Sequence, residues 1–228
     1  ILKARGILGL VIGPTPGLPV VPDLEWKEFA PVKIGVPLPG LPVPCAVSNH
    51  YQAMRRVLEQ LQELGIRRVG LVLEEHQDAK TSGLWLAPMA AHQQQVAKAD
   101  RVPPLLLSSW RQTDFGRWFR RYRPEVIVGL RRGVIDWLAG LGRRVPEEVG
   151  FVHLDRGTEP GDFAGIDQRA ATIGAAAVDL VMNRLLLNER GLPDTQRSLM
   201  IDGVWVPGPT LRAPVGPGGS PRGLRGRG

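Results

Sequence analysis

The 228-residue sequence lacks the features that mark several common classes of protein. It has a single cysteine, Cys45, so no disulfide can form within the chain, and a reducing compartment is the simpler interpretation. No apolar run approaches the roughly 18 residues that a membrane-crossing helix needs. The apolar start at residues 7–12 is soon interrupted by Pro14 and has no small-residue cleavage site, so it does not resemble a signal peptide. These absences favour a cytoplasmic protein with no membrane partner.

Motifs of enzymes and of metal sites are missing as well. The sequence has no G-x-S-x-G elbow, no H-E-x-x-H, no Walker loop and no G-x-G-x-x-G after a strand. Its histidines, His50, His76, His92 and His153, are scattered without metal-ligand spacing. Cys45 stands in an apolar run, which is more typical of a small buried hydrophobe than of a nucleophile. We therefore expect no enzyme, no cofactor and no metal.

Basic residues are in excess, with a formal net charge of +7, but they do not gather into a pattern that indicates nucleic-acid binding. Arg222, Arg225 and Arg227 supply three of these charges in a terminal stretch without acidic residues. The remainder is spread along the chain, whereas a nucleic-acid footprint needs basic residues clustered on one face. Residues 213–228 are mostly Gly, Pro and Arg and cannot bury enough apolar surface to fold, so we expect a disordered tail.

Short apolar runs alternate with helical patterns, which predicts an α/β protein with mostly parallel sheets. The clearest helix follows Asn49, where apolar residues recur at spacings of three and four. Asn49 can cap its start and Gly65 can provide its left-handed end. Further helices are expected at residues 114–122, 133–141 and 170–188. Pro- and Gly-rich residues at 14–22 and 38–44 are expected to form turns and spacers. The expected strands span residues 8–12, 32–36, 45–48, 69–73, 105–107, 126–130 and 149–154.

Two short apolar runs end in polar residues that indicate a binding site. Asp155 follows the strand predicted at 149–154, and Gln168 ends the run that begins at residue 164 and leads into the long helix. Ligands of open α/β sheets lie beyond the carboxyl ends of strands, so both side chains predict a small-molecule site. Alternatively, Asp155 pairs with its neighbour Arg156, and Gln168 caps the helix or braces a crossover between domains.

The segment VPEEVGFVHLD at residues 145–155, followed by AGIDQ at 164–168, resembles a signature of LacI/GalR-type (lactose-repressor-like) transcription regulators. The segments LGIRRVGL at 64–71 and IGAAAV at 173–178 are similar to other landmarks of that family and occur in the same order. The resemblance extends up to Arg212. It implies the family's effector-binding domain, a two-lobed periplasmic-binding-protein-like type I fold with parallel sheets flanked by helices.

The same resemblance implies a division into subdomains and a regulatory function. Residues 1–66 and 166–188 would form the first, N-terminal subdomain, and residues 67–165 and 197–212 the second. The family's helix-turn-helix and its opening strand-helix-strand-helix portion are missing and the first residue is Ile1, so we expect an N-terminally truncated first subdomain. The chain would sense a sugar or sugar derivative, form a homodimer and act on operator DNA through a helix-turn-helix outside it.

Two other functional classes remain open at this point. A periplasmic solute (sugar)-binding protein of a transporter would share the two-lobed fold and would have a signal peptide upstream in place of a helix-turn-helix. An α/β enzyme is supported by the fold class alone, and a fold does not imply a function.

Family positions add residues to the predicted site. Lys80 stands where the family usually has an arginine that grips the ligand. Arg131 follows a strand after which the family often has Asn-Asp, and Asn49 and His50 follow a strand where the family often has an acidic contact. Trp85 is better interpreted as helix core than as a platform for a sugar ring. Lys80 together with Arg131 indicates an anionic or unusually substituted effector. The expected ligand-binding residues are Lys80, Asp155, Gln168, Asn49, His50 and Arg131.

Overall fold

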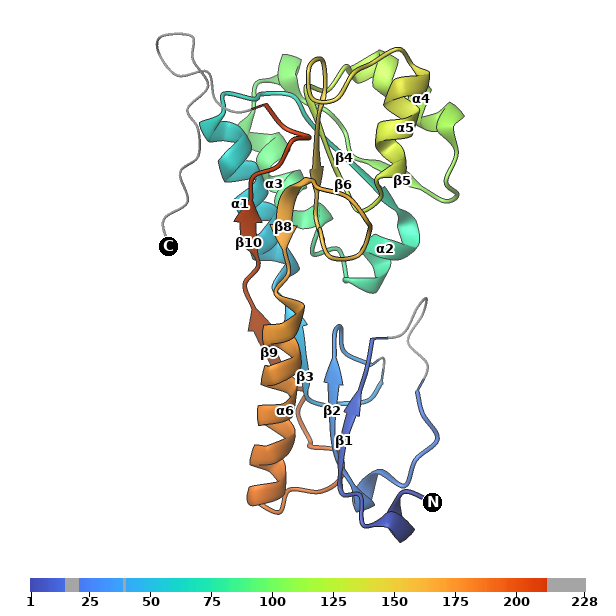
Figure 1. The fold of residues 1–228 in the computed structure, drawn as a ribbon, viewed down its shortest axis with the longest axis vertical. Coiled ribbons are helices and arrows are strands. Elements are labelled where there is room, and N and C mark those ends of the chain that lie inside the picture. The colour runs from blue at the N-terminus through green and yellow to red at the C-terminus, as the bar shows by residue number, and fades with distance from the viewer. Residues whose placement is uncertain (15–20, 39, 213–228) are drawn as a thin grey trace.

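A computed structural model describes residues 1–14, 21–38 and 40–212 and shows two lobes, each built on its own sheet (Figure 1). The α/β architecture with parallel sheets and flanking helices is confirmed. The tail expected at residues 213–228 and part of the spacer expected at 14–22 lie outside the described residues. Within the described ranges, none of the helices is both long enough and apolar enough to cross a membrane.

The larger lobe contains a six-stranded sheet in the order β10-β8-β7-β6-β4-β5. Neighbouring strands are parallel except for β10, which runs antiparallel to β8. The strands are β4 (Val69–Glu74), β5 (Leu105–Leu107), β6 (Val126–Gly129), β7 (Gly150–His153), β8 (Ala164–Asp167) and β10 (Val204–Val206). The helices of this lobe are α1 (His50–Glu63), α2 (Glu75–Lys80), α3 (Leu86–Gln95), α4 (Gln112–Tyr122) and α5 (Gly133–Gly140).

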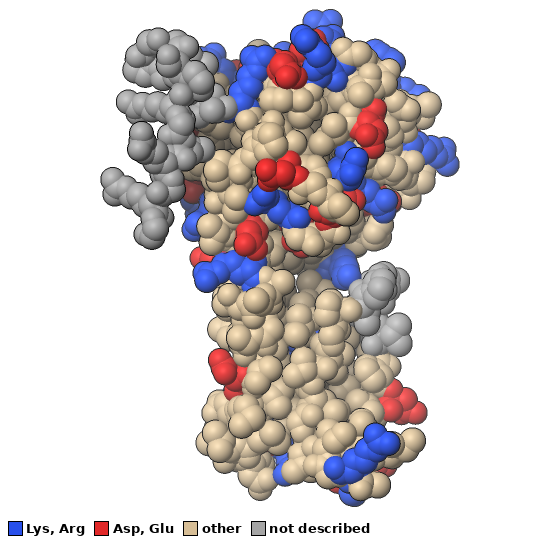
Figure 2. Space-filling model, in the orientation of Figure 1, with Lys and Arg blue, Asp and Glu red and all other residues tan. Residues whose placement is uncertain are grey.

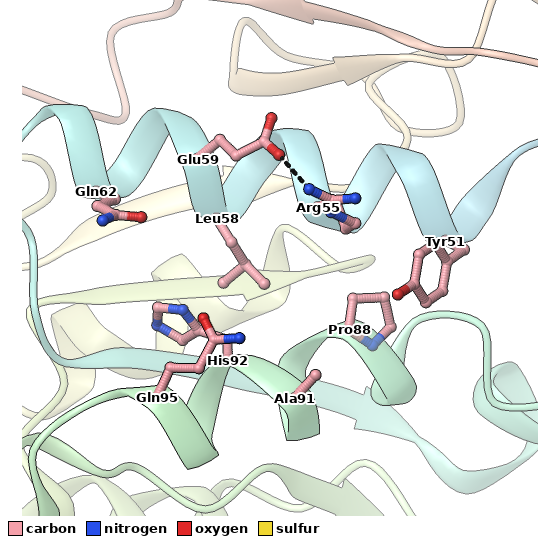
Figure 3. A pocket seen from close by; sticks show the side chains of 9 residues that line it. All are labelled: Tyr51, Arg55, Leu58, Glu59, Gln62, Pro88, Ala91, His92 and Gln95. Atoms are coloured by element: carbon pink, nitrogen blue, oxygen red, sulfur yellow. Dashed lines mark hydrogen bonds and ion pairs between the residues drawn. The ribbon is translucent and has the colours of Figure 1, made fainter.

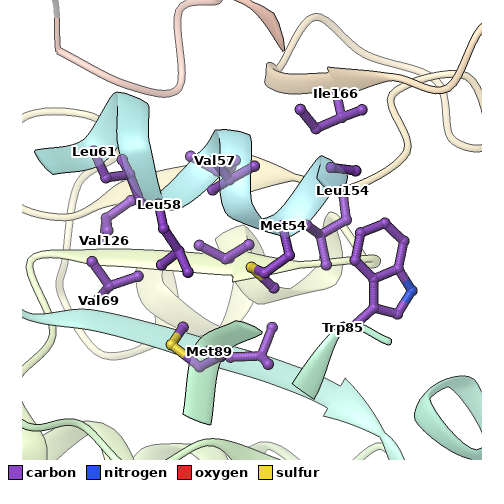
Figure 4. Close-up of a cluster of buried hydrophobic side chains, with 14 of the residues drawn as sticks. Met54, Val57, Leu58, Leu61, Val69, Trp85, Met89, Val126, Leu154 and Ile166 are labelled. Carbon is purple, nitrogen blue, oxygen red and sulfur yellow. The ribbon is translucent and has the colours of Figure 1, made fainter. Parts of the chain in front are cut away.

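Both faces of this sheet are covered because its strands are apolar on both sides. Along β4, Leu71 and Leu73 belong to the core beneath α1 and α3, which Figure 4 shows from close by. Val72 points to the opposite core, where it packs with Phe115 of α4 and Leu138 of α5. Continuous apolar runs are the expected pattern for parallel strands buried on two sides.

Helix α1 follows directly from its local sequence. The side chain of Asn49 accepts a hydrogen bond from the backbone N–H of Gln52 at 3.1 Å, as the predicted N-cap should. Gly65 has the left-handed φ of 74° that was predicted for the end of the helix. The buried residues of α1 repeat at helical spacing and are Ala53, Met54, Val57, Leu58 and Leu61.

The smaller lobe contains a four-stranded parallel sheet in the order β1-β2-β3-β9. Helix α6 (Ala170–Leu186) lies along this sheet and contacts all of its strands (Figure 1). The packing is close at Gly9, where an added Cβ would lie 2.5 Å from the side chain of Val181. The strands are β1 (Gly9–Ile12), β2 (Ala30–Ile34), β3 (Cys45–Ser48) and β9 (Ser198–Ile201). Short 3-10 helices complete the described elements: η1 (Lys3–Arg5) and η2 (Trp26–Glu28) before β2, and η3 (Lys98–Asp100) before β5.

The chain passes between the lobes after β3, after β8 and after β9, and this differs from the predicted subdomain boundaries. Helix α1 was expected in the first subdomain, within residues 1–66, but it packs on α3, β8 and β10 of the larger lobe. Residues 197–212 were expected in the second subdomain, but β9 pairs with β3 in the smaller lobe. In each case the partner decides the lobe, because the apolar stripe of α1 is covered by β4 and its neighbours and the backbone of β9 is satisfied by β3.

Candidate functional site

A cleft of about 680 Å³ lies between the lobes. The carboxyl ends of the parallel strands point toward it from both sides, with β2 and β3 below and β4, β6 and β7 above in the view of Figure 1. This is where a small-molecule site is expected in an α/β protein, and the volume lies within the usual range of small-molecule sites. Side chains from both lobes line the cleft, so a ligand there would touch both.

The structure brings most of the predicted site residues together. The five that line the cleft are His50, Lys80, Arg131, Asp155 and Gln168. Asn49 does not line it. Its side chain caps α1, and its Nδ2 donates to Asp202 Oδ1 at 2.9 Å across the crossover that follows β9. The local signal that made Asn49 a good helix cap therefore accounts for its position, and its predicted ligand contact has no geometric support.

Asp155 follows β7 and presents a carboxyl group with an altered affinity for protons. Burial raises the pKa of Asp155 to about 6, the backbone N–H of Gly157 opposes this shift, and the nearby carboxylate of Asp167 adds to it. The backbone N–H of Asp155 donates to Nδ1 of the buried His153 at 3.1 Å, which fixes the loop. At neutral pH the carboxylate of Asp155 is mostly ionised and can accept hydrogen bonds from ligand hydroxyls.

Gln168 lies where the chain leaves β8 for α6 and is 5% exposed. Its Nε2 donates to the carbonyl oxygen of Leu154 at 2.7 Å, so the amide braces the crossover, as one of the predicted alternatives had it. Its Oε1 is buried and has no hydrogen-bond partner among the described residues. A buried acceptor without a partner is costly, so a ligand hydroxyl or a bound water in the cleft would satisfy it.

His50 and Trp85 form the apolar part of the wall. Trp85 is 1% exposed and packs in the core beneath α1, in agreement with the favoured interpretation (Figure 4). Its ring centroid lies 4.6 Å from that of His50. Burial lowers the pKa of His50 to about 4, so this imidazole is neutral at pH 7. One ring nitrogen of His50 is buried without a partner within the described chain.

Arg131 is held in place by two neighbours at the end of β4 and before α4. Its Nε lies 2.6 Å from Glu74 Oε2, and its guanidinium stands 5.1 Å from the ring centroid of Trp110. The Glu74 carboxylate offsets part of the positive charge, and the two contacts together fix the orientation of the guanidinium. Arg131 can therefore donate hydrogen bonds in a set direction at this wall of the cleft.

Sequence reasoning missed Lys33, which lines the cleft from the smaller lobe. Lys33 lies in the central strand β2 and is 2% exposed, and its Nζ donates to the carbonyl oxygen of Ile34 at 3.0 Å. Burial lowers the pKa of Lys33, and the positive charge of Lys80 lowers it further. The signal was present in the sequence: a lysine within an otherwise apolar strand, close to the strand's carboxyl end.

A second hollow, of about 410 Å³, lies in the larger lobe between α1 and α3 (Figure 3). None of the predicted site residues lines it. Arg55 and Glu59, both on α1, pair with each other across its wall at 3.0 Å. Because only one lobe forms this hollow and two of its polar side chains satisfy each other, the cleft between the lobes is the better candidate. Among the described residues, no group of three or more His, Cys, Asp or Glu side chains could hold a metal ion.

Comparison with known proteins identifies relatives of the fold. No protein-family model matches the sequence, and no curated protein matches it significantly. Solved structures do match. A LacI family transcriptional regulator from Enterococcus faecium with bound ribose has a TM-score of 0.64 and 14% identity, over 93% of this chain and 82% of that one. A LacI transcriptional regulator from a Rhodococcus species has a TM-score of 0.63 and 18% identity, over 92% and 80%.

A third match is a periplasmic binding protein/LacI transcriptional regulator from Alkaliphilus metalliredigens in complex with D-xylulofuranose. It has a TM-score of 0.62 and 12% identity, over 93% of this chain and 80% of that one. At such identities the likeness is one of fold. The chain therefore has the two-lobed fold of LacI-type regulators and periplasmic binding proteins, as its sequence motifs predicted.

Proposed function

We propose that this chain is the effector-binding domain of a LacI-type transcription regulator and that the cleft between its lobes binds a small sugar-like molecule. One observation carries the proposal: polar side chains from both lobes, Lys33 below and Lys80, Asp155 and Gln168 above, line one cleft at the strand ends. Two of the matched structures hold a pentose, ribose in one and D-xylulofuranose in the other. The shared fold supports a comparable ligand here.

The wall residues have distinct proposed roles. The carboxylate of Asp155 accepts hydrogen bonds from ligand hydroxyls, and the unpartnered Oε1 of Gln168 accepts another. Arg131, oriented by Glu74, donates to a ligand oxygen. The neutral ring of His50, which packs against the buried Trp85, supplies an apolar surface for the ligand.

The proposed mechanism is a shift between two arrangements of the lobes. The three connections between the lobes are short, after β3, β8 and β9, and they allow one lobe to turn relative to the other. A ligand that contacts both walls stabilises the arrangement in which both walls reach it. In a dimeric cytoplasmic regulator, a DNA-binding unit outside these residues would respond to that shift, with operator and effector affinities linked.

The fold also supports a solute-binding protein of a transporter, because the matched Alkaliphilus metalliredigens protein is described as a periplasmic binding protein/LacI transcriptional regulator. The two functions make opposite predictions about the full-length protein. A regulator binds a specific DNA sequence, and its affinity for that sequence falls or rises when the effector is added. A transporter component binds ligand but no operator.

The test is calorimetric titration of the full-length protein with a panel of pentoses, hexoses and their derivatives, repeated on Asp155→Ala. Loss of its hydrogen bonds should weaken binding by about ten- to a hundredfold without unfolding the protein. Asp194→Ala, which removes an exposed carboxylate outside the cleft, is the matched control and should leave affinity unchanged. Equal affinity of Asp155→Ala and the unaltered protein would remove Asp155 from the site, and failure to bind any member of the panel would count against the proposed function.

A further inference from the structure

Lys33 is an unusual residue for its place in the fold. It lies in β2, between β1 and β3 of a parallel sheet, where Ile12 and Cys45 are its neighbours in register. Parallel strands of this kind are usually apolar throughout. A charged ammonium group with 2% exposure is costly unless it is paired, yet the smaller lobe places one at the floor of the cleft.

The groups around Lys33 use only part of its hydrogen-bonding capacity. An ammonium group has three donors, and the carbonyl oxygen of Ile34 takes one at 3.0 Å. Among the described residues, no carboxylate lies within ion-pair distance of Lys33. Cys45 is only a weak countercharge that raises the pKa of Lys33, because burial raises the pKa of its thiol and its Sγ donates to Ser198 Oγ at 3.2 Å.

The opposite wall of the cleft adds a second positive charge. Lys80 ends α2 in the larger lobe and lines the same cleft. It is close enough that its charge lowers the pKa of Lys33. Two like charges on facing walls repel each other, and the repulsion is strongest where water is excluded. An anion placed between them would turn this repulsion into an attraction that draws the lobes together.

Most of the acidic groups near the cleft are engaged elsewhere. Glu74 pairs with Arg131, while Glu159 accepts from the backbone N–H of Arg132 and lies 3.4 Å from His153. Asp155 remains as the carboxylate suited to accepting hydrogen bonds from ligand hydroxyls. The cleft therefore combines a hydroxyl-binding region near Asp155 and Gln168 with a cationic region between Lys33 and Lys80.

We infer that the ligand of this cleft is a polyhydroxylated acid, a sugar-sized molecule whose carboxylate or phosphate group is held between Lys33 of the smaller lobe and Lys80 of the larger one. This inference rests on the proposed function and specifies its ligand class. The anionic group bridges the lobes, so it also acts as the element that stabilises the closed arrangement. A neutral sugar would leave the repulsion between Lys33 and Lys80 in place.

The first experiment compares matched ligand pairs by calorimetry on the full-length protein: D-glucuronate against D-glucose, and D-ribose 5-phosphate against D-ribose. At least one anion should bind at least about tenfold more tightly than its neutral counterpart. Lys33→Met and Lys80→Gln should each remove that preference. Lys98→Met, which changes an exposed lysine of η3, is the matched control and should retain it.

The second experiment uses thermal unfolding and needs no knowledge of the natural ligand. Lys33→Met should unfold at a higher temperature than the unaltered protein without ligand, because it removes a buried charge. It should also lose the stabilisation that inorganic phosphate gives relative to chloride at equal ionic strength. A structural lysine would show the reverse, with a lower unfolding temperature and an unchanged response to phosphate.

The anionic ligand class and the proposed function are contradicted by different results. If neutral sugars bind as tightly as their acids, and Lys33→Met binds them equally well, the anionic class is wrong while a sugar-binding regulator stands. If neither sugars nor acids bind, the proposed function fails. If phosphate stabilises the unaltered protein no better than chloride, the cationic region does not bind anions and the inference is overturned.

Discussion

The two lobes solve the same problem, the burial of a parallel sheet, to different extents. The larger lobe covers both faces of six strands, with α1 and α3 on one side and α4 and α5 on the other. In the described part of the smaller lobe, four strands are packed against a single α-helix, α6. Its buried apolar cluster consists of Val32, Ala46, Ile173, Ala177 and Val181. Free energy of folding scales with buried apolar area, so the larger lobe should be the more stable one.

The surfaces of the two lobes also differ, in how many charged side chains they carry. Figure 2 shows charged groups over much of the larger lobe and mostly uncharged atoms on the smaller lobe in this view. The outer side of α6 keeps Val178, Met182 and Leu186 half or more exposed, and Met200 of β9 is 51% exposed. The cleft therefore joins a well-packed wall to one that is expected to be less stable. The lobe with fewer buried contacts is then the one expected to move when ligand binds.

Core truncation should give the largest difference between the lobes. Phe115→Ala removes a fully buried ring from the larger lobe and should lower the free energy of unfolding by about 3–5 kcal/mol. Ile173→Ala in the smaller lobe should lower the free energy of unfolding by about 2–3 kcal/mol, because the apolar cluster around Ile173 is smaller and can relax more. Urea unfolding measures both values. Equal losses would contradict the ranking of the lobes, and Val178→Ala, at an exposed position, serves as the control with a change below about 0.5 kcal/mol.

A larger side chain at Gly9 should destabilise the smaller lobe without destabilising the larger one. Gly9→Val places a side chain against Val181 of α6, and overpacking of this kind costs about 1–3 kcal/mol. Hydrogen exchange should accelerate in α6 and β1 while the amides of β4 and β6 keep their protection. Gly13→Ala is the matched control, since nothing lies within 4 Å of its added Cβ. Faster exchange throughout both lobes would show that they unfold as one unit.

The smallest expected effect concerns Asp155 at the boundary between the lobes. Its folded-state pKa of about 6 lies above the ordinary value of 3.8, so the folded protein binds a proton more tightly than the unfolded chain. Stability should therefore fall as pH rises from about 4 to 6 and stay lower above that range, by about 1–2 kcal/mol after allowance for solvent screening. Asp155→Asn should remove this part of the pH dependence and weaken ligand binding. An unchanged stability profile would mean that the carboxyl is not desolvated.

Individual elements were largely predictable because their causes are local. The period of the apolar residues and the polar group of Asn49 set the start and the buried face of α1, and Gly65 ends it. The carboxyl ends of β7 and β8 were recognisable from Asp155 and Gln168 for the same reason. Helix α4 begins at Gln112, two residues before the predicted start, and Asp114 lies in its first turn. Propensities and caps act within a few residues, so a linear sequence displays them directly.

Local sequence signals did not predict which lobe each element belongs to. The apolar stripe of α1 shows that it packs on something, but only the folded chain brings α3, β8 and β10 to it. Likewise no strand was predicted at residues 198–201, and β9 forms there in the smaller lobe through its hydrogen bonds to β3. The ion pair between Glu74 and Arg131 also joins the ends of two different strands, far apart along the chain.

The α/β class, the approximate limits of most helices and strands, and the polar residues that follow β7 and β8 were predictable from the sequence. They were predictable because these properties depend on spacing and residue type within short segments. Only the folded chain shows which lobe contains α1 and β9, that Asn49 lies away from the cleft, and that Lys33 lines the same cavity as Lys80. Those facts depend on which surfaces meet in space, and neither the spacing nor the type of residues in one segment specifies the surface that will cover it.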